Sequence, residues 1–171
     1  LDPGGRAMTI RGPTDADGNP TAILDGQEST RVLICESGET SATIFENLVI
    51  QNGYSSIDGG GMYNTSSPTL TNCAFTNNSA NYGGGMFNSS SSNPTLENCT
   101  FTSNSAVSSG GGMYNNSSSP TLTGCVFEGN SAAWDGGGMY NTSSSTLTNC
   151  AFTNNSADYG GGMYNSSSSN P

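Results

Sequence analysis

The sequence predicts an all-β solenoid, in which short parallel strands stack on their own copies along one axis. A segment of 24 residues at 59–82, GGGMYNTSSPTLTNCAFTNNSANY, recurs at 83–109, 110–135 and 136–159, and a fifth copy begins at Gly160. Repeats of this length are typical of folds in which one supersecondary unit packs on the next. Apolar and polar residues alternate over short segments, which favours strands, and a glycine triplet opens each copy, which a helix interior does not tolerate.

Residues 1–42 are interpreted as diverged N-terminal coils of the same array. Short strands with alternating polarity are predicted at 7–11, 21–24 and 32–35. Loops rich in Asp, Gly, Asn, Ser and Pro are predicted at 13–20 and 36–41. Ile23 precedes Leu48 by 25 residues, so both are expected in one column of the solenoid.

Residues 43–171 are interpreted as the regular repeats. The stretch 43–51, TIFENLVIQ, is predicted to form two strands around a polar corner at Asn47. In each later coil a glycine triplet leads into a strand, 60–64 in the first copy, and TLTNCAF forms two more strands around a corner at Asn72. About six coils of about 25 residues are expected. Because the sequence starts without Met and stops within the fifth copy, we interpret it as a piece of a longer protein, with an open strand edge after Asn165.

Equivalent residues of successive coils are expected to form ladders along the axis. A single coil buries too few apolar side chains to offset its conformational entropy, so stability must come from pairing with its neighbours. The predicted inward residues of the first clear coil include Met62 and Ala80 as well as Leu, Cys and Phe of TLTNCAF. The structural core ladder is Leu70, Leu96, Leu122 and Leu147, with Cys73, Cys99, Cys125 and Cys150, and with Phe75, Phe101, Phe127 and Phe152.

Three columns of asparagine are also expected, because the Asn side chain both donates and accepts hydrogen bonds and tolerates the left-handed backbone of a sharp corner. They are Asn72, Asn98 and Asn149, interrupted by Gly124; Asn64, Asn88, Asn115, Asn141 and Asn165; and Asn78, Asn104, Asn130 and Asn155.

The pairing of a Gly-Gly-Gly-Met element with F-x-x-N, at 75–78, 101–104, 127–130 and 152–155, resembles a known repeat. It is similar to the repeat of the polymorphic outer membrane proteins, a surface-exposed autotransporter family in which Gly-Gly-Ala usually precedes Ile, Leu or Val. More broadly, the chain resembles pectate-lyase-like repeat proteins, many of them bacterial and extracellular. The resemblance implies a right-handed parallel β-helix (β-solenoid) and a location outside the cell or on the bacterial outer surface.

The cysteine column has several possible roles. Its spacing of 25–26 residues and the absence of His argue against a zinc cluster. In-register side chains point the same way, which is a poor fit to a disulfide torsion, so buried free thiols acting as apolar filler are favoured and a disulfide is the alternative. Leu48 at the same position supports filler, and Cys35 lies off the column with no role assigned.

No catalytic, cofactor-binding or metal-binding residues are predicted. The glycine triplets lack the context of a phosphate loop and are interpreted as tight bends. The acids of the repeats are scattered over different coils, and no basic residue follows Arg31: they are Asp58, Glu97, Glu128, Asp135 and Asp158. An enzyme is therefore disfavoured but left open, and weak Ca²⁺ binding at the Asp-Gly corners is a further alternative.

One aromatic residue follows Met in each coil. Tyr63, Phe87, Tyr114, Tyr140 and Tyr164 are predicted to face outward as a possible ligand-contact stripe. Exposed aromatic residues with hydroxyls suit a glycan or a host or cell-surface protein, and stacking from coil to coil is the alternative. Thr-x-Thr pairs resemble the flat arrays of ice-binding solenoids, but Glu97 interrupts them.

The net charge of −10 makes nucleic acid and anionic membrane surfaces poor partners, and no apolar run is long enough for a membrane helix. The expected function is a non-enzymatic segment of a cell-surface or secreted protein, a structural stalk or adhesin-like passenger. The alternative is a pectate-lyase-like carbohydrate-active protein. End-to-end self-association is expected if the last strand edge is open.

Overall fold

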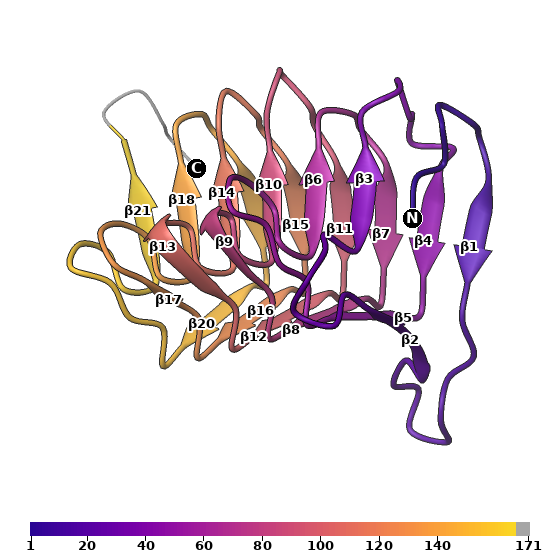
Figure 1. Ribbon diagram of the computed structural model, residues 1–171, viewed down its shortest axis with the longest axis horizontal. Coiled ribbons are helices and arrows are strands. Elements are labelled where there is room, and N and C mark those ends of the chain that lie inside the picture. The colour runs from indigo at the N-terminus through magenta and orange to yellow at the C-terminus, as the bar shows by residue number, and fades with distance from the viewer. Residues whose placement is uncertain (167–171) are drawn as a thin grey trace.

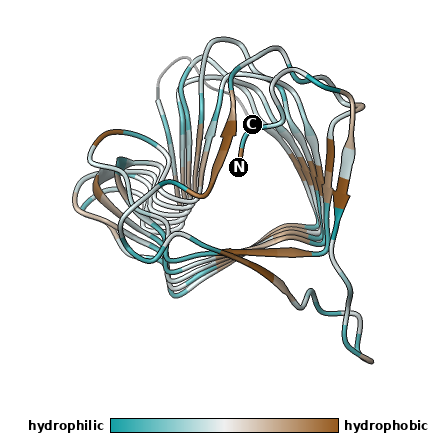
Figure 2. Ribbon diagram, turned by 45° about the vertical axis from the view of Figure 1, so that its right-hand side comes forward, coloured by the Kyte–Doolittle hydropathy of each residue, from teal (hydrophilic) through white to brown (hydrophobic). Residues whose placement is uncertain are grey.

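The computed structural model describes residues 1–166 and is a parallel β-solenoid of about six turns with about 26 residues per turn. Figure 1 shows the strands standing side by side along the long axis, from the N-terminal coil to the C-terminal one. Viewed closer to that axis, the coils superpose into a three-sided outline (Figure 2). The all-β fold class is thus confirmed. No helix of the described residues is long and apolar enough to cross a membrane.

Three sheets, each of six parallel strands, form the walls. Sheet A comprises β1 (Thr9–Arg11), β4 (Ile44–Glu46), β7 (Thr69–Thr71), β11 (Thr95–Glu97), β15 (Thr121–Thr123) and β19 (Thr146–Thr148). Sheet B comprises β2 (Ala22–Asp25), β5 (Leu48–Gln51), β8 (Ala74–Thr76), β12 (Thr100–Thr102), β16 (Val126–Glu128) and β20 (Ala151–Thr153). Sheet C comprises β3 (Leu33–Cys35), β6 (Met62–Asn64), β10 (Met86–Asn88), β14 (Met113–Asn115), β18 (Met139–Asn141) and β21 (Met163–Asn165).

A short fourth sheet, sheet D, lies between sheets B and C along the chain. It comprises β9 (Ser79–Tyr82), β13 (Ser105–Ser109) and β17 (Ser131–Ala132). The sequence analysis treated these polar segments as the closing part of each coil, because only one small apolar residue, such as Ala80, marks them. Their pairing therefore came from the stacking of the coils and left little signal in the local pattern.

The strands of neighbouring coils pair without a shift in the three large sheets, so like residues stack on like. Leu70 pairs with Leu96 and Leu96 with Leu122, and Phe75, Phe101 and Phe127 are aligned in the same way. Their side chains are fully buried, and consecutive phenylalanine rings lie 4.6 to 4.8 Å apart. The last members of the columns, Leu147, Cys150 and Phe152, are only partly buried and pack against this core.

Left-handed backbone recurs at three places in each coil. At the corner between sheets A and B, φ is 57° at Asn47, 50° at Asn72, 51° at Asn98, 65° at Gly124 and 54° at Asn149. L-residues other than Asn and Asp rarely adopt this conformation, and Gly adopts it freely. The predicted column of Asn72, Asn98 and Asn149 therefore lies at the corner of each coil. Gly124, which interrupts the column in sequence, has the same backbone conformation as the asparagines.

The two other Asn columns lie inside the solenoid. From Asn64 to Asn165, each side-chain amide donates to the oxygen of the next, over 2.7 to 2.9 Å. In the Asn78 column, the Nδ2 atom of Asn104 donates to the Phe75 carbonyl at 2.9 Å, and its Oδ1 atom accepts from Asn78 N at 3.0 Å. The expectation that these columns bond along the axis is confirmed.

Two details of the first coils differ from the expectation. Leu48 pairs with Ala22, so Ile23 is one residue out of the predicted column and its side chain is 58% exposed. A shift of one residue moves every side chain of a strand to the opposite face, and spacing alone could not distinguish the two registers. Cys35 pairs with Asn64 and is fully buried, so it occupies the start of the Asn64 column.

Candidate functional site

The aromatic stripe predicted from the sequence lies on the outer face of sheet C, one ring per coil. In-register pairing of β6, β10, β14, β18 and β21 aligns Tyr63, Phe87, Tyr114, Tyr140 and Tyr164. Consecutive ring centroids are 5.7, 5.4, 4.6 and 5.4 Å apart, and the planes are within 12° of parallel. The rings thus form one continuous stack along the solenoid.

This stacking determines what the stripe can offer to a ligand. Because each inner ring has a neighbouring ring on both faces, only its edge and hydroxyl group point away from the stack. Phe87 lies on this outer face as predicted, but its side chain is covered and only 6% exposed, so it is not open to a ligand. Tyr82 of sheet D packs edge-on against Tyr114, at 5.2 Å and 68°. The stripe therefore presents hydroxyls and ring edges, and its inner rings have no free face on which a sugar could stack.

The N-terminal end of the stack is covered by Arg31. Its guanidinium lies 4.8 Å from the centroid of the Tyr63 ring, a cation–π contact. The same group donates hydrogen bonds to the carbonyl oxygens of Asp58 at 2.6 Å and Gly59 at 2.9 Å, and to Ser55 Oγ at 3.2 Å. The sequence showed Arg31 only as the last basic residue, and its structural role depends on contacts with a coil about 27 residues later.

A groove of about 330 Å³ runs between the stripe and the neighbouring segment of the coils. Its lining residues are Ile57, Asp58, Tyr82, Phe87, Tyr114 and Asn116. Burial raises the pKa of Tyr114 to about 12, with Tyr140, Tyr82 and two carboxylates adding to the shift. Burial also raises the pKa of Asp58, and Arg31 opposes that shift. The groove thus combines phenol, carboxyl and amide groups on an apolar floor.

The other acids of the repeats lie apart from one another. Glu97, Glu128 and Asp158 are exposed on three different coils. Asp135 pairs through isolated bridges with Ser109 and Tyr159, in the column that also holds Asp58 and Tyr82. Within residues 1–166, no three His, Cys, Asp or Glu side chains are grouped so that they could hold a metal ion.

The architecture matches one family model. The model described as "right handed beta helix region" matches residues 24–171. The chain belongs to this right-handed β-helix family. The handedness that the sequence resemblance implied is thereby confirmed. No curated protein and no solved structure gave a significant match. The narrower likeness to polymorphic outer membrane proteins or to pectate lyases stays a prediction.

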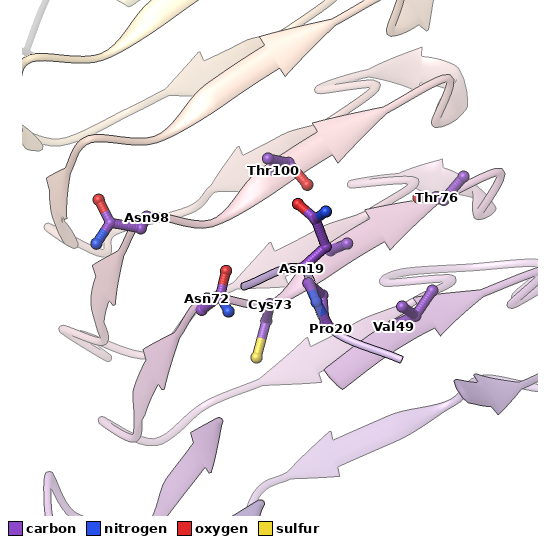
Figure 3. A pocket seen from close by; sticks show the side chains of 9 residues that line it. Asn19, Pro20, Val49, Asn72, Cys73, Thr76, Asn98 and Thr100 are labelled. Carbon is purple, nitrogen blue, oxygen red and sulfur yellow. The ribbon is translucent and has the colours of Figure 1, made fainter. Parts of the chain in front are cut away.

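A second groove of this β-helix, of about 290 Å³, lies where the loop at 13–20 approaches sheet B (Figure 3). The side-chain amide of Asn72 donates to the Gly18 carbonyl at 2.9 Å and holds the loop there. Pro20, Asn72 and Cys73 lie close together in this view, and the Cys73 sulfur points away from the Asn19 side chain. No acidic or basic side chain lines this groove.

The cysteine column of the β-helix lies at the corner between sheets A and B. Cys73, Cys99 and Cys125 are at most 1% exposed, and Cys150 is partly exposed in the last coil. All are free thiols, and each Sγ contacts a backbone oxygen of the preceding coil, as Cys99 contacts Leu70 O at 3.6 Å. The sequence left open whether these cysteines are free thiols or form a disulfide, and in the structure they are free thiols. Cys35 is also a free thiol, and burial raises its pKa to about 12.

Proposed function

We propose that this β-helix is a rigid, non-enzymatic segment of a cell-surface or secreted protein, acting as a structural stalk or adhesin-like passenger. The observation that carries the proposal is the in-register repetition of every outer face. Strands of neighbouring coils lie about 4.8 Å apart, so each face repeats nearly the same side chains at that interval. A catalytic centre needs different groups that converge on one point, whereas these faces are suited to presenting a uniform surface over a distance.

The composition supports the same function. The outer positions of sheet A are mainly Thr, at Thr69, Thr71, Thr121 and Thr123 among others, and the net charge of −10 keeps such a polar rod soluble. The location on a cell surface or outside the cell rests on the resemblance of the F-x-x-N and Gly-rich elements to autotransporter repeats. A glycan or a surface protein of another cell is the partner that this proposal implies.

The test uses the full-length protein that contains this chain. It is incubated with polygalacturonate and other polysaccharides, with and without Ca²⁺, and the release of reducing ends is measured. In parallel, binding of the same samples to a glycan array and to cells is recorded. The stalk proposal predicts no release under any condition. Release of reducing ends would reject it and would favour the pectate-lyase-like alternative.

The groove beside the stripe favours a second candidate function, glycan binding without cleavage. Tyr82 and Tyr114 hydroxyls, the Asp58 carboxyl and the Asn116 amide line one groove, and such groups can hydrogen-bond sugar hydroxyls. Because the ring faces are covered, a glycan would bind here through hydrogen bonds and ring edges.

Tyr114→Phe tests this candidate, because it removes one hydroxyl and leaves the stack intact. We expect glycan affinity to fall about two- to twelvefold, which corresponds to the loss of one hydrogen bond of about 0.5–1.5 kcal/mol. The matched control is Tyr54→Phe, at a side chain that is 46% exposed and outside this groove. Equal affinity of Tyr114→Phe and the unmodified protein would reject glycan binding in the groove.

A further inference from the structure

The four cysteines at the corner between sheets A and B form a straight row of sulfur atoms. The residues on either side of the corner pair in register, Leu96 with Leu122 and Phe101 with Phe127. The thiols of successive coils must therefore follow the strand spacing, and their sulfur atoms lie about 4.8 Å apart.

This spacing does not suit a disulfide. A disulfide needs sulfur atoms about 2.0 Å apart and Cβ atoms about 3.5–4.5 Å apart, with the two side chains turned toward each other. In the column the side chains are parallel and the Cβ atoms keep the distance of the strands. The paired strands on both sides prevent the backbone from closing that difference, which agrees with the free thiols of the structure.

The same spacing fits a metal ion held by two sulfurs in a line. Metal–thiolate bonds are about 2.3 Å long, so two sulfurs on opposite sides of one ion are about 4.6 Å apart. At a metal-bound thiolate, the Cβ–Sγ and Sγ–metal bonds meet at a bent angle. Here each side chain points into the core and the row of sulfurs runs along the axis, so an ion between two sulfurs meets each of them at such an angle. Ions that require four ligands, such as Zn²⁺, find only a row of sulfurs and no tetrahedron.

The charge of the core limits which ion fits. The three cations of the sequence are arginines that precede residue 32, and the column is surrounded by Leu, Phe and backbone. Binding of a divalent ion follows Hg²⁺ + 2 Cys–SH → Cys–S–Hg–S–Cys + 2 H⁺, without oxidation or reduction, and the product is neutral. A monovalent ion with two thiolates would leave one negative charge buried without a partner, which is costly. Thiolates also select soft ions.

We propose that the cysteine column is a binding site for soft divalent metal ions that take two ligands in a line, with one ion between Cys73 and Cys99 and a second between Cys125 and Cys150. Cys150 is partly exposed and gives access to the C-terminal end of the row. Cys73 is buried with its sulfur turned away from Asn19, so an ion reaches the other end of the row only when the coil opens. The site is independent of the stalk function, since it lies inside the solenoid.

The probe is Hg²⁺ alone, added to the reduced chain together with a small competing monothiol. Native mass spectrometry counts the ions in the folded chain and shows whether an ion also carries the competitor, which marks a single-thiol adduct. X-ray absorption counts the sulfurs around each ion. We expect two ions per chain with two protein sulfurs each. Cys35→Ala, outside the column, is expected to keep both ions.

Two double variants test whether binding needs thiols on neighbouring coils or only the same number of thiols. Cys99→Ala/Cys150→Ala leaves two thiols of the column, Cys73 and Cys125, two coils apart at about 9.6 Å, and is expected to hold no ion between two protein sulfurs. Cys73→Ala/Cys99→Ala also removes two thiols but leaves Cys125 next to Cys150, and is expected to hold one. Circular dichroism checks that both variants fold.

Equal numbers of two-sulfur ions in the two double variants would overturn the proposal. So would a folded unmodified chain that binds Hg²⁺ only as single-thiol adducts. If a double variant fails to fold, the single variant Cys150→Ala decides, because it changes the most exposed position of the column. It is expected to lower the count from two ions to one, and an unchanged count would overturn the proposal.

Discussion

Asparagine has two different tasks in each turn, and the direction of its side chain decides which. At the corner between sheets A and B, Asn98 is exposed and its contribution is a backbone with φ of 51°. Asn104 is fully buried, and its side chain makes hydrogen bonds to the coils before and after it. The first task needs only tolerance of left-handed backbone, whereas the second needs both a donor and an acceptor.

The two tasks predict different costs of substitution. Asn104→Ala leaves the amide of Asn78 and the carbonyl of Phe75 without their partner inside the core, so we expect a loss of about 3–5 kcal/mol in the free energy of unfolding. Asn98→Gly keeps the corner backbone and should lower the free energy of unfolding by no more than about 1 kcal/mol, through the greater freedom of glycine in the unfolded chain. Urea unfolding followed by circular dichroism measures both. Similar costs for the two variants would contradict this division.

Tyr114 predicts how the stability depends on alkaline pH. Its pKa is raised from 10.0 to about 12 in the folded chain, chiefly by burial. The unfolded chain loses this proton first, so the contribution of Tyr114 is complete below about pH 10 and is lost as the pH rises through about 12. Urea unfolding at several pH values should therefore show a smaller alkaline loss for Tyr114→Phe than for the unmodified chain.

The control for this prediction is Tyr159→Phe, at a side chain that is 67% exposed. It removes a tyrosine from the same region without removing a buried phenol, so its alkaline loss should match that of the unmodified chain. Identical pH dependence of Tyr114→Phe and the unmodified chain would show that the burial of this hydroxyl has no effect on stability.

At the scale of elements, the sequence predicted the strands where apolar residues alternate and missed those where they do not. The segments around Leu70 and Phe75 carry a period of two, so β7 and β8 could be placed together with the Asn72 corner. Sheet D could not be placed, because Ala80 is the one apolar residue that marks the inner face of β9. Its strands form because the coils on either side already hold them at pairing distance.

The sequence predicted that the aromatic residues of the candidate site align along the axis, but not how much of each ring is exposed. Repetition placed the five aromatic residues in one line, whereas the covering of their faces depends on ring orientation, which periodicity does not contain. The burial of Phe87 and the contact between Arg31 and Tyr63 depend on segments that lie outside the strand pattern. The position of Cys35 could not be predicted for the same reason, because only its pairing with Asn64 in the structure places it in the Asn64 column.

Glycines at two places in the coil should respond differently to substitution: Gly85, in the bend before a strand of sheet C, and Gly124, at the corner between sheets A and B. A Cβ atom at Gly85 would lie 2.5 Å from the Gly112 carbonyl oxygen of the next coil, and that backbone cannot move without breaking the ladder. Gly85→Ala should therefore lower the free energy of unfolding by about 1–3 kcal/mol. At Gly124, with φ of 65°, the nearest atom is the movable Asn98 side chain.

Gly124→Asn should accordingly be neutral or stabilising by up to about 1 kcal/mol, because it restores the residue of the other corners and reduces the freedom of the unfolded chain. Thermal and urea unfolding of the two variants provide the comparison. A larger loss for Gly124→Asn than for Gly85→Ala would mean that left-handed backbone, and not crowding between coils, limits these positions.

At the scale of the whole molecule, each coil depends on its neighbours for its core. Leu122 and Phe127 are fully buried between coils, whereas Leu147 and Phe152, with a described coil on one side, are only partly buried. Stability in such an array is close to a sum of nearest-neighbour terms. The length of the solenoid should therefore be adjustable by whole coils, a property that the proposed stalk function requires.

Deletion of residues 100–125 removes one period of 26 residues and joins Cys99 to Val126, which restores every ladder. We expect the shortened chain to fold with unchanged circular dichroism per residue and a rod about 4.8 Å shorter, measured by small-angle scattering. Deletion of residues 100–121 removes almost as much chain but joins Cys99 to Leu122, so residues 122–125 are left as an extra segment at the tight corner between sheets A and B. The free energy of unfolding should therefore be clearly lower than for the deletion of 26 residues. If both deletions unfold the chain, long-range features of particular coils, and not the repeated register, hold the solenoid together. If both fold equally well, the register is less restrictive than the in-register ladders imply.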